Sequence, residues 1–143
     1  MPPLVFEQSF RVVMSEVDVA QIHFTALFRW MDRGLTEWLA LAGHPFTRLL
    51  EEGPGIPLVD VRATFRERIL LDDILVLRTW AAAPGRTSFR TRHRFVRGGS
   101  VAAEGEAVHV CVHRATRETV PVPDWLRGLA ADDGWTPPQG TEP

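Results

Sequence analysis

The chain of 143 residues contains no tyrosine, one cysteine and no apolar run long enough to cross a bilayer. Cys111 has no partner within the chain, which excludes an internal disulfide and fits a reducing compartment. The opening residues lack the charged start and the apolar stretch of a secretory signal. A net charge of −2 argues against a protein that mainly coats nucleic acid. We therefore expect a cytoplasmic protein with neither a membrane nor a nucleic acid as partner.

Hydrophobic residues make up 45% of the chain, which is enough to build a core, and the length corresponds to about one domain. From Asp132 onward the sequence is rich in glycine and proline. Such terminal segments are commonly mobile. The sequence therefore predicts a single domain over residues 1–127 and a flexible C-terminal tail over residues 128–143.

One long amphipathic helix is predicted over residues 25–42. Its apolar residues recur at helical spacing: Leu27, Met31, Leu35, Trp38 and Ala42. Thr25 is a suitable N-cap, and Gly43 is a suitable stop. A helix with such a stripe needs a sheet to cover it.

Strand patterns fill most of the remaining chain. We predict strands over residues 6–14, 58–68, 74–82, 87–97 and 101–113, and short helical turns at 46–52 and 124–126. Within 87–97 the alternation places Phe89, Thr91, His93 and Phe95 on one face and the arginines on the other. The prediction is an α+β fold in which an antiparallel sheet of about five strands wraps the helix, with the last four strands in hairpin succession.

A carboxylate lies just before the predicted helix. Asp18 precedes Thr25 by seven residues, with His23 and Phe24 between them. The N–H groups at a helix start stabilise negative charge on an oxygen, and a carboxylate can attack or deprotonate. This combination suits the cleavage of an acyl bond. The alternative is that Asp18 is an Asx-turn or capping residue.

Other chemistry-bearing residues give weaker signals. Glu37 and Asp32 lie within the helix, where a solvated face or an interface ion pair explains them. The five histidines show no metal-binding pair on a helix, and the serines lack a G-x-S-x-G motif. Cys111 lies among valines, as a core residue would. We therefore expect neither a metal site nor a serine hydrolase.

Three stretches resemble one enzyme family. Val17-Asp18-Val19-Ala20-Gln21-Ile22, followed by Phe28-Arg29-Trp30-Met31-Asp32, is similar to the "D-x-x-G-(I/V)" loop and helix start of the hotdog-fold acyl-CoA thioesterases, in the 4-hydroxybenzoyl-CoA thioesterase and YbgC-like group. Leu71-Asp72-Asp73 within 65–77 is similar to a turn of that family. Arg86-Thr87-Ser88-Phe89 and Val120-Pro121-Val122-Pro123 complete the resemblance. The chain has Gln21 where the family usually has glycine, and Thr25 where tyrosine or histidine is frequent.

The resemblance implies a hotdog fold, a homodimer or homotetramer, and hydrolysis of a small acyl-CoA thioester without metal or organic cofactor, coenzyme A entering as part of the substrate. It maps the catalytic carboxylate onto Asp18 and the carbonyl-polarising amide onto Thr25. His23 and Phe24 are then candidate substrate contacts. Arginine forks bind phosphate well, so the residues around the predicted turn at 84–86 are candidate coenzyme A contacts. These are Arg86, Ser88 and Arg90.

Two alternatives remain open at this point. One is an acyl-CoA-binding hotdog protein without catalysis. The other is a hotdog hydratase or dehydratase, for which His23 with Glu37 is the only candidate histidine–acid pair.

Overall fold

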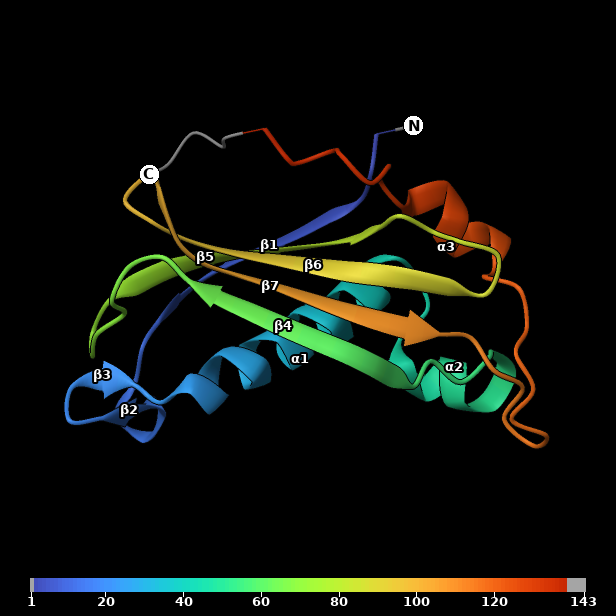
Figure 1. The fold of residues 1–143 in the computed structure, drawn as a ribbon, viewed down its shortest axis with the longest axis horizontal. Helices are drawn as coiled ribbons and strands as arrows, with labels where there is room; N and C mark the ends of the chain where they lie inside the picture. The colour runs from blue at the N-terminus through green and yellow to red at the C-terminus, as the bar shows by residue number, and fades with distance from the viewer. Residues whose placement is uncertain (1, 139–143) are drawn as a thin grey trace.

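The computed structural model describes residues 2–138, and Figure 1 shows a curved sheet with one long helix packed against its concave face. The sequence predictions of the long helix and the strand-rich remainder are confirmed. In chain order the elements are β1 (Val5–Arg11), the short 3-10 turn η1 (Met14–Glu16), β2 (Val17–Asp18), β3 (Gln21–Ile22), α1 (Phe24–Leu41), α2 (Phe46–Glu52), β4 (Leu58–Phe65), β5 (Ile74–Ala82), β6 (Ser88–Arg97), β7 (Ser100–Val110) and α3 (Asp124–Leu129).

The large sheet is antiparallel and has the order β1-β5-β6-β7-β4. The five strands and their antiparallel pairing match the prediction. The predicted hairpin succession is wrong for one strand, because β4 pairs with β7 at the sheet edge and does not pair with β5. The order of the strands in the sequence does not reveal this pairing, because the partner of each strand is determined by tertiary packing.

The segment 66–73 carries the chain from the edge strand β4 to the interior strand β5, and it satisfies its backbone groups on the way. Ile22 donates to Ile69 O at 3.0 Å, and Leu71 donates to Ala20 O at 2.8 Å. Asp72 donates to Val12 O at 3.1 Å. These bonds satisfy peptide groups of the connection that would otherwise be unpaired. They also hold the β2–β3 hairpin against residues 69–71.

Two glycines fix where α1 crosses the sheet. A Cβ on Gly34 would overlap Thr79 Oγ1 and would lie 2.9 Å from His93 Nδ1. A Cβ on Gly105 would overlap Met31. The helix backbone therefore approaches β5 and β6 closely, and Met31 fills the space left by the missing side chain on β7. Glycine within a helix is about 1 kcal/mol less favourable than alanine, so the close approach at Gly34 lowers the intrinsic stability of α1 by about that amount.

The two faces of the sheet differ sharply in chemistry. Phe89, Thr91, His93 and Phe95 of β6 are buried, as the alternation predicts. The intervening arginines of β6 lie on the outer face, away from α1. Across the described part of the chain, no helix combines the length and the apolarity that crossing a bilayer requires.

Residues 131–138 lie along the sheet. Ala131 bridges to Ala82, Trp135 packs edge-on against Trp80 with 6.1 Å between ring centroids, and Arg78 Nη1 donates to Pro138 O at 2.9 Å. The boundary after residue 127 and the mobility of the tail stay predictions, and residues 139–143 of that tail lie outside the described residues. Residues 131–138 pack on the outer face of the sheet.

A chain of hydrogen bonds crosses the interior beneath α1. Thr79 Oγ1 lies 2.8 Å from His93 Nδ1, and His93 Nε2 lies 3.3 Å from Thr91 Oγ1. Thr91 Oγ1 lies 3.2 Å from His109 Nε2, and His109 Nδ1 lies 3.2 Å from Ile56 O. Burial lowers the pKa of both histidines, that of His93 from 6.5 to about 3. Both rings are therefore neutral near pH 7.

Because both imidazoles are neutral, the donor and the acceptor of every hydrogen bond in this series are determined. His109 Nδ1 must donate to the carbonyl of Ile56, so its Nε2 accepts from the hydroxyl of Thr91. The oxygen of Thr91 then accepts from His93 Nε2–H, and His93 Nδ1 accepts from the hydroxyl of Thr79. Each ring nitrogen is satisfied, which allows two imidazoles to be buried at low cost.

Acid should destabilise the protein through His93. Between about pH 6.5 and about pH 3 the unfolded chain binds a proton at this residue that the folded chain refuses, so stability falls as the pH is lowered through this window. Urea unfolding at several pH values measures the slope. His93→Gln keeps polar groups but does not titrate, and it should flatten the slope. Equal slopes in the wild type and in His93→Gln would contradict this assignment.

Candidate functional site

Asp18 lies at the end of a tight two-residue hairpin. β2 pairs with β3 through Val17–Ile22 and Asp18–Gln21, leaving Val19 and Ala20 as the turn. Both turn residues have positive φ, 51° and 73°, as a type I′ turn requires. A β-branched residue in this region is a true outlier, and strain of this kind gathers at functional sites. Gln21 has no positive φ, so this conformation does not require the family's glycine there.

The hairpin runs directly into the start of α1. His23 N donates to Glu16 O at 2.9 Å, extending the β2–β3 ladder by one rung. The carboxylate of Glu16 holds both sides of this junction: Oε1 accepts from Val13 N at 2.9 Å, and Oε2 accepts from Trp30 Nε1 at 2.5 Å. A side chain from the second turn of α1 is thus tied to the base of the hairpin. The position of Asp18 relative to the helix start is thereby fixed.

The helix begins one residue earlier than predicted, and its N-cap is His23 rather than Thr25. The imidazole Nδ1 of His23 accepts the backbone N–H of Thr25 at 3.3 Å and lies 2.8 Å from Thr25 Oγ1. Arg29 Nη1 also donates to that hydroxyl at 3.2 Å. Histidine is not a usual capping residue. The amide that the resemblance assigns to carbonyl polarisation is therefore already occupied by a side chain of the same chain.

Asp18 itself is exposed, and no hydrogen bond or ion pair engages its carboxylate among residues 2–138. A carboxylate with no fixed partner is free to meet a ligand. It also gains no orientation from the single chain. The geometry therefore gives Asp18 a fixed backbone but leaves its side chain to be positioned by substrate or by a second protomer.

A cavity of about 290 Å³ opens beside α1, on the flank that faces β4. Its lining is mostly apolar, with polar atoms from the buried hydrogen-bond chain and from one carboxylate. The lining residues are Phe28, Met31, Asp32, Leu35, Phe46, Ile56, Leu58, Val61, Thr91, His93, Ala107 and His109. We call this space the inner cavity. The rings of Phe24 and Phe28 meet edge-on with centroids 6.5 Å apart, which links the helix start to the cavity wall.

The other helix carboxylates occupy different places. Asp32 lines the inner cavity, although the sequence offered only a solvated face or an ion pair for it. Glu37 is exposed and lies about 20 Å along the helix axis from His23. The histidine–acid pair that a hydratase would need is therefore not assembled within the chain.

A family model decides the broader identity. The model described as the thioesterase-like superfamily matches residues 12–129. The chain belongs to the thioesterase-like superfamily. This match covers the hairpin, α1 and every strand of the large sheet except β1.

Solved structures of thioesterases share the superfamily fold with this chain. A gentisyl-coenzyme A thioesterase is 25% identical, with a TM-score of 0.75, and the match covers 85% of this chain and 99% of that one. A 1,4-dihydroxy-2-naphthoyl-CoA thioesterase from Synechocystis is 16% identical, with a TM-score of 0.78 and coverages of 87% and 94%. An aspartate-to-asparagine mutant of 4-hydroxybenzoyl-CoA thioesterase complexed with 4-hydroxybenzoyl-CoA is 20% identical, with a TM-score of 0.76 and coverages of 87% and 97%. The hotdog fold is therefore confirmed.

Membership in the superfamily leaves the predicted coenzyme A contacts untested. Ser88 begins β6, whereas the hairpin packs against residues 69–71, beside the far end of that strand. Ten residues of strand span about 30 Å. Arg90 points to the outer face and pairs with Glu106 Oε1 at 2.5 Å. Within one chain of this thioesterase-like protein, Arg86, Ser88 and Arg90 are thus not brought to Asp18.

Cys111 is buried, as expected of a core residue, and burial raises the pKa of its thiol to about 11. It is therefore a poor nucleophile. Among residues 2–138 no three histidine, cysteine or acidic side chains gather in a way that could hold a metal ion.

Proposed function

We propose that the protein hydrolyses small acyl-CoA thioesters to a free acid and coenzyme A. The observation that carries this proposal is the hairpin that presents Asp18 and continues through one hydrogen-bonded ladder into the start of α1. Membership in the thioesterase-like superfamily supports it. So do the three similar structures described above, each of which is named as the thioesterase of an aromatic acyl-CoA. No metal or organic cofactor takes part in the proposed reaction.

The thioester carbonyl would lie between Asp18 and the amides at the start of α1. As a nucleophile, Asp18 would attack the carbonyl carbon, form a mixed anhydride and expel the coenzyme A thiolate, after which water cleaves the anhydride. As a general base, it would take a proton from the attacking water. In both routes the Thr25 N–H stabilises the developing oxyanion, a contribution of about 3 kcal/mol in comparable sites.

The acyl group would occupy the inner cavity. Phe24 at the helix start contacts Phe28 in the cavity wall, which gives a continuous apolar path from the reaction centre. A volume of about 290 Å³ suits a short or single-ring acyl group and excludes a long fatty chain. Phe24 is thus a proposed substrate contact.

A second copy of the chain would complete the site. The edge strand β4 exposes apolar side chains, namely Leu58, Val59, Val61 and Phe65, whereas the exposed residues of the opposite edge strand β1 are polar. A long apolar edge is a template for pairing. Pairing through β4 would place a partner against the open flank of α1, and the coenzyme A contacts proposed at Arg86, Ser88 and Arg90 would then come from the assembly.

Asp18→Asn should lower the rate of thiol release by about 100-fold or more, because the amide neither attacks nor accepts a proton. The assay follows free thiol across a panel of aromatic and short-chain acyl-CoA esters. Asp72→Asn is the matched control, because Asp72 is an exposed carboxylate at the same end of the molecule with a φ of 71° that asparagine tolerates. An unchanged rate in Asp18→Asn would remove Asp18 from the mechanism.

His23→Ala should raise kcat/KM about two- to tenfold, because the substrate carbonyl no longer has to displace the imidazole from the Thr25 N–H. His113→Ala is the control, since His113 Nδ1 also accepts backbone N–H groups in an exposed turn away from the hairpin. A fall in kcat/KM carried by a higher KM would instead make His23 a direct substrate contact.

Val61→Glu should convert the assembly to monomers, since a buried carboxylate opposes pairing along β4. Light scattering after size-exclusion chromatography measures the mass. Leu50→Glu replaces an exposed leucine on α2, away from β4, and should leave the mass unchanged. A monomeric wild-type protein would refute the shared site.

A non-catalytic acyl-CoA-binding protein is the second candidate, because His23 occupies the Thr25 amide and Asp18 is exposed. Purified protein that binds acyl-CoA esters but releases no thiol would favour it.

A further inference from the structure

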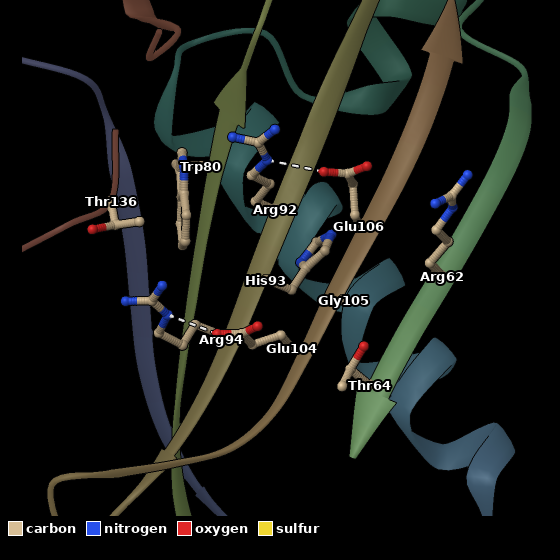
Figure 2. A pocket seen from close by; sticks show the side chains of 10 residues that line it. All are labelled: Arg62, Thr64, Trp80, Arg92, His93, Arg94, Glu104, Gly105, Glu106 and Thr136. Atoms are coloured by element: carbon tan, nitrogen blue, oxygen red, sulfur yellow. Dashed lines mark hydrogen bonds and ion pairs between the residues drawn. The ribbon is translucent and has the colours of Figure 1, made fainter. Parts of the chain in front are cut away.

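A second pocket lies on the opposite side of the sheet from α1. It has a volume of about 340 Å³ and is formed mainly by the outer faces of β4, β5, β6 and β7, with Thr136 of the C-terminal segment at its rim and His93 of the buried face also in its lining. Figure 2 shows Trp80, Arg94 and Thr136 on one side of it and Arg62 and Thr64 on the other. We call it the outer pocket. Its lining shares only His93 with the inner cavity and includes no residue of the β2–β3 hairpin, so it is distinct from the proposed thioesterase site.

The two carboxylates in the outer pocket are already engaged. Glu106 accepts from Arg90 through Oε1 at 2.5 Å and from Arg92 through Oε2 at 3.0 Å. Glu104 accepts from Arg66 through Oε2 at 3.0 Å, and its Oε1 lies 3.7 Å from Arg94 Nε. Both carboxylates are therefore ion-paired, so arginines already balance their negative charge.

Two donors in the same pocket have no hydrogen-bond acceptor among the described residues. Trp80 is 2% exposed, and its indole N–H has no hydrogen-bond partner among residues 2–138. The same holds for Arg94 Nε, which is too far from Glu104 for a hydrogen bond. Leaving a buried donor unpaired is costly, and native structures rarely do so without water or a ligand. The pocket thus has a surplus of donors over acceptors.

The surplus faces the pocket from both sides. On one side Arg94 lies over the ring of Trp80, with 5.8 Å between its guanidinium carbon and the ring centroid. On the other side the only ion pair of Arg62 within residues 2–138 is made through Nε, with Asp60 at 3.2 Å. Its terminal nitrogens are left for another acceptor. Arginine forks match the planar geometry of carboxylate and phosphate oxygens.

We propose that the outer pocket binds a small molecule bearing a phosphate or carboxylate group, held between Arg94 with Trp80 on one side and Arg62 on the other. The volume lies near the lower end of the range for ligand sites, about 300–1,000 Å³, which argues for a compact ligand. The ring of Trp80 is covered by Arg94 and Trp135, so no aromatic face is open for stacking. Recognition therefore depends on the anionic oxygens.

The C-terminal segment shapes this site. Arg92 pairs with Asp133 through Nη2 and Oδ1 at 2.5 Å, and Ala131 N donates to Ala81 O at 2.8 Å. These contacts hold the segment across β5 and β6 next to Thr136. The pocket is thus built from strands and a terminal segment that are far apart in the sequence.

Calorimetric titration of the full-length protein tests the proposal with pyrophosphate in one arm and benzoate in the other. Binding in either arm is expected, and the tighter anion identifies the phosphate or the carboxylate source. Arg94→Gln should weaken that binding about tenfold or more, because one charged donor is lost. Arg33→Gln, which removes an exposed arginine from α1, should bind like the wild type.

The indole N–H resonance of Trp80 supplies a second measurement, made on the wild-type protein. It should shift on titration of the anion, and Trp80→Phe serves to assign it. Absence of binding by both anions would overturn the proposal. So would binding that is unaffected by Arg94→Gln and leaves the Trp80 resonance in place. Neither result bears on thiol release, so failure here is separable from failure of the proposed hydrolase.

Discussion

The close approach of α1 to the sheet at Gly34 governs the rest of the molecule. Because the helix carries no side chain there, its backbone lies against Thr79 and His93, and it cannot slide or rotate without a clash. The position of the helix start follows from this contact, and so does the place of the hairpin tied to it by Glu16. The helix lies mainly over β5 and β1, which leaves the flank toward β4 open and creates the inner cavity.

The repeating elements were predictable because their signals are local. The spacing of apolar residues predicts residues 25–42 as helix, and α1 runs from Phe24 to Leu41. The alternation along β6 separates its buried face from its arginine face for the same reason. The pairing of β4 with β7 was not predictable, since it depends on how residues 66–73 find partners in the hairpin. Helix capping by His23 was missed because histidine carries no general capping preference.

The candidate site likewise has one part that the sequence predicts and another that it does not. The segment around Asp18 could be recognised because its residues are contiguous. The inner cavity could not, since its lining comes from α1, α2, β4, β6, β7 and a loop, and no short pattern joins them. The alternation places His93 on the same face as Phe89 and Phe95, yet nothing local indicates that it bonds with Thr79 and Thr91. The sequence also does not reveal that Ser88, the first residue of β6, lies at the end of the sheet opposite the hairpin.

In the buried chain of hydrogen bonds from Thr79 to Ile56, every bond has the same donor-to-acceptor direction. Each member accepts on one side and donates on the other, so its neighbours dictate the tautomer of each ring. Exchanging one histidine for an isosteric group with the opposite order of donor and acceptor would strand atoms at both junctions. The side chains at positions 79, 91, 93 and 109, on three different strands, are therefore constrained together, whereas position 56 contributes only its backbone carbonyl.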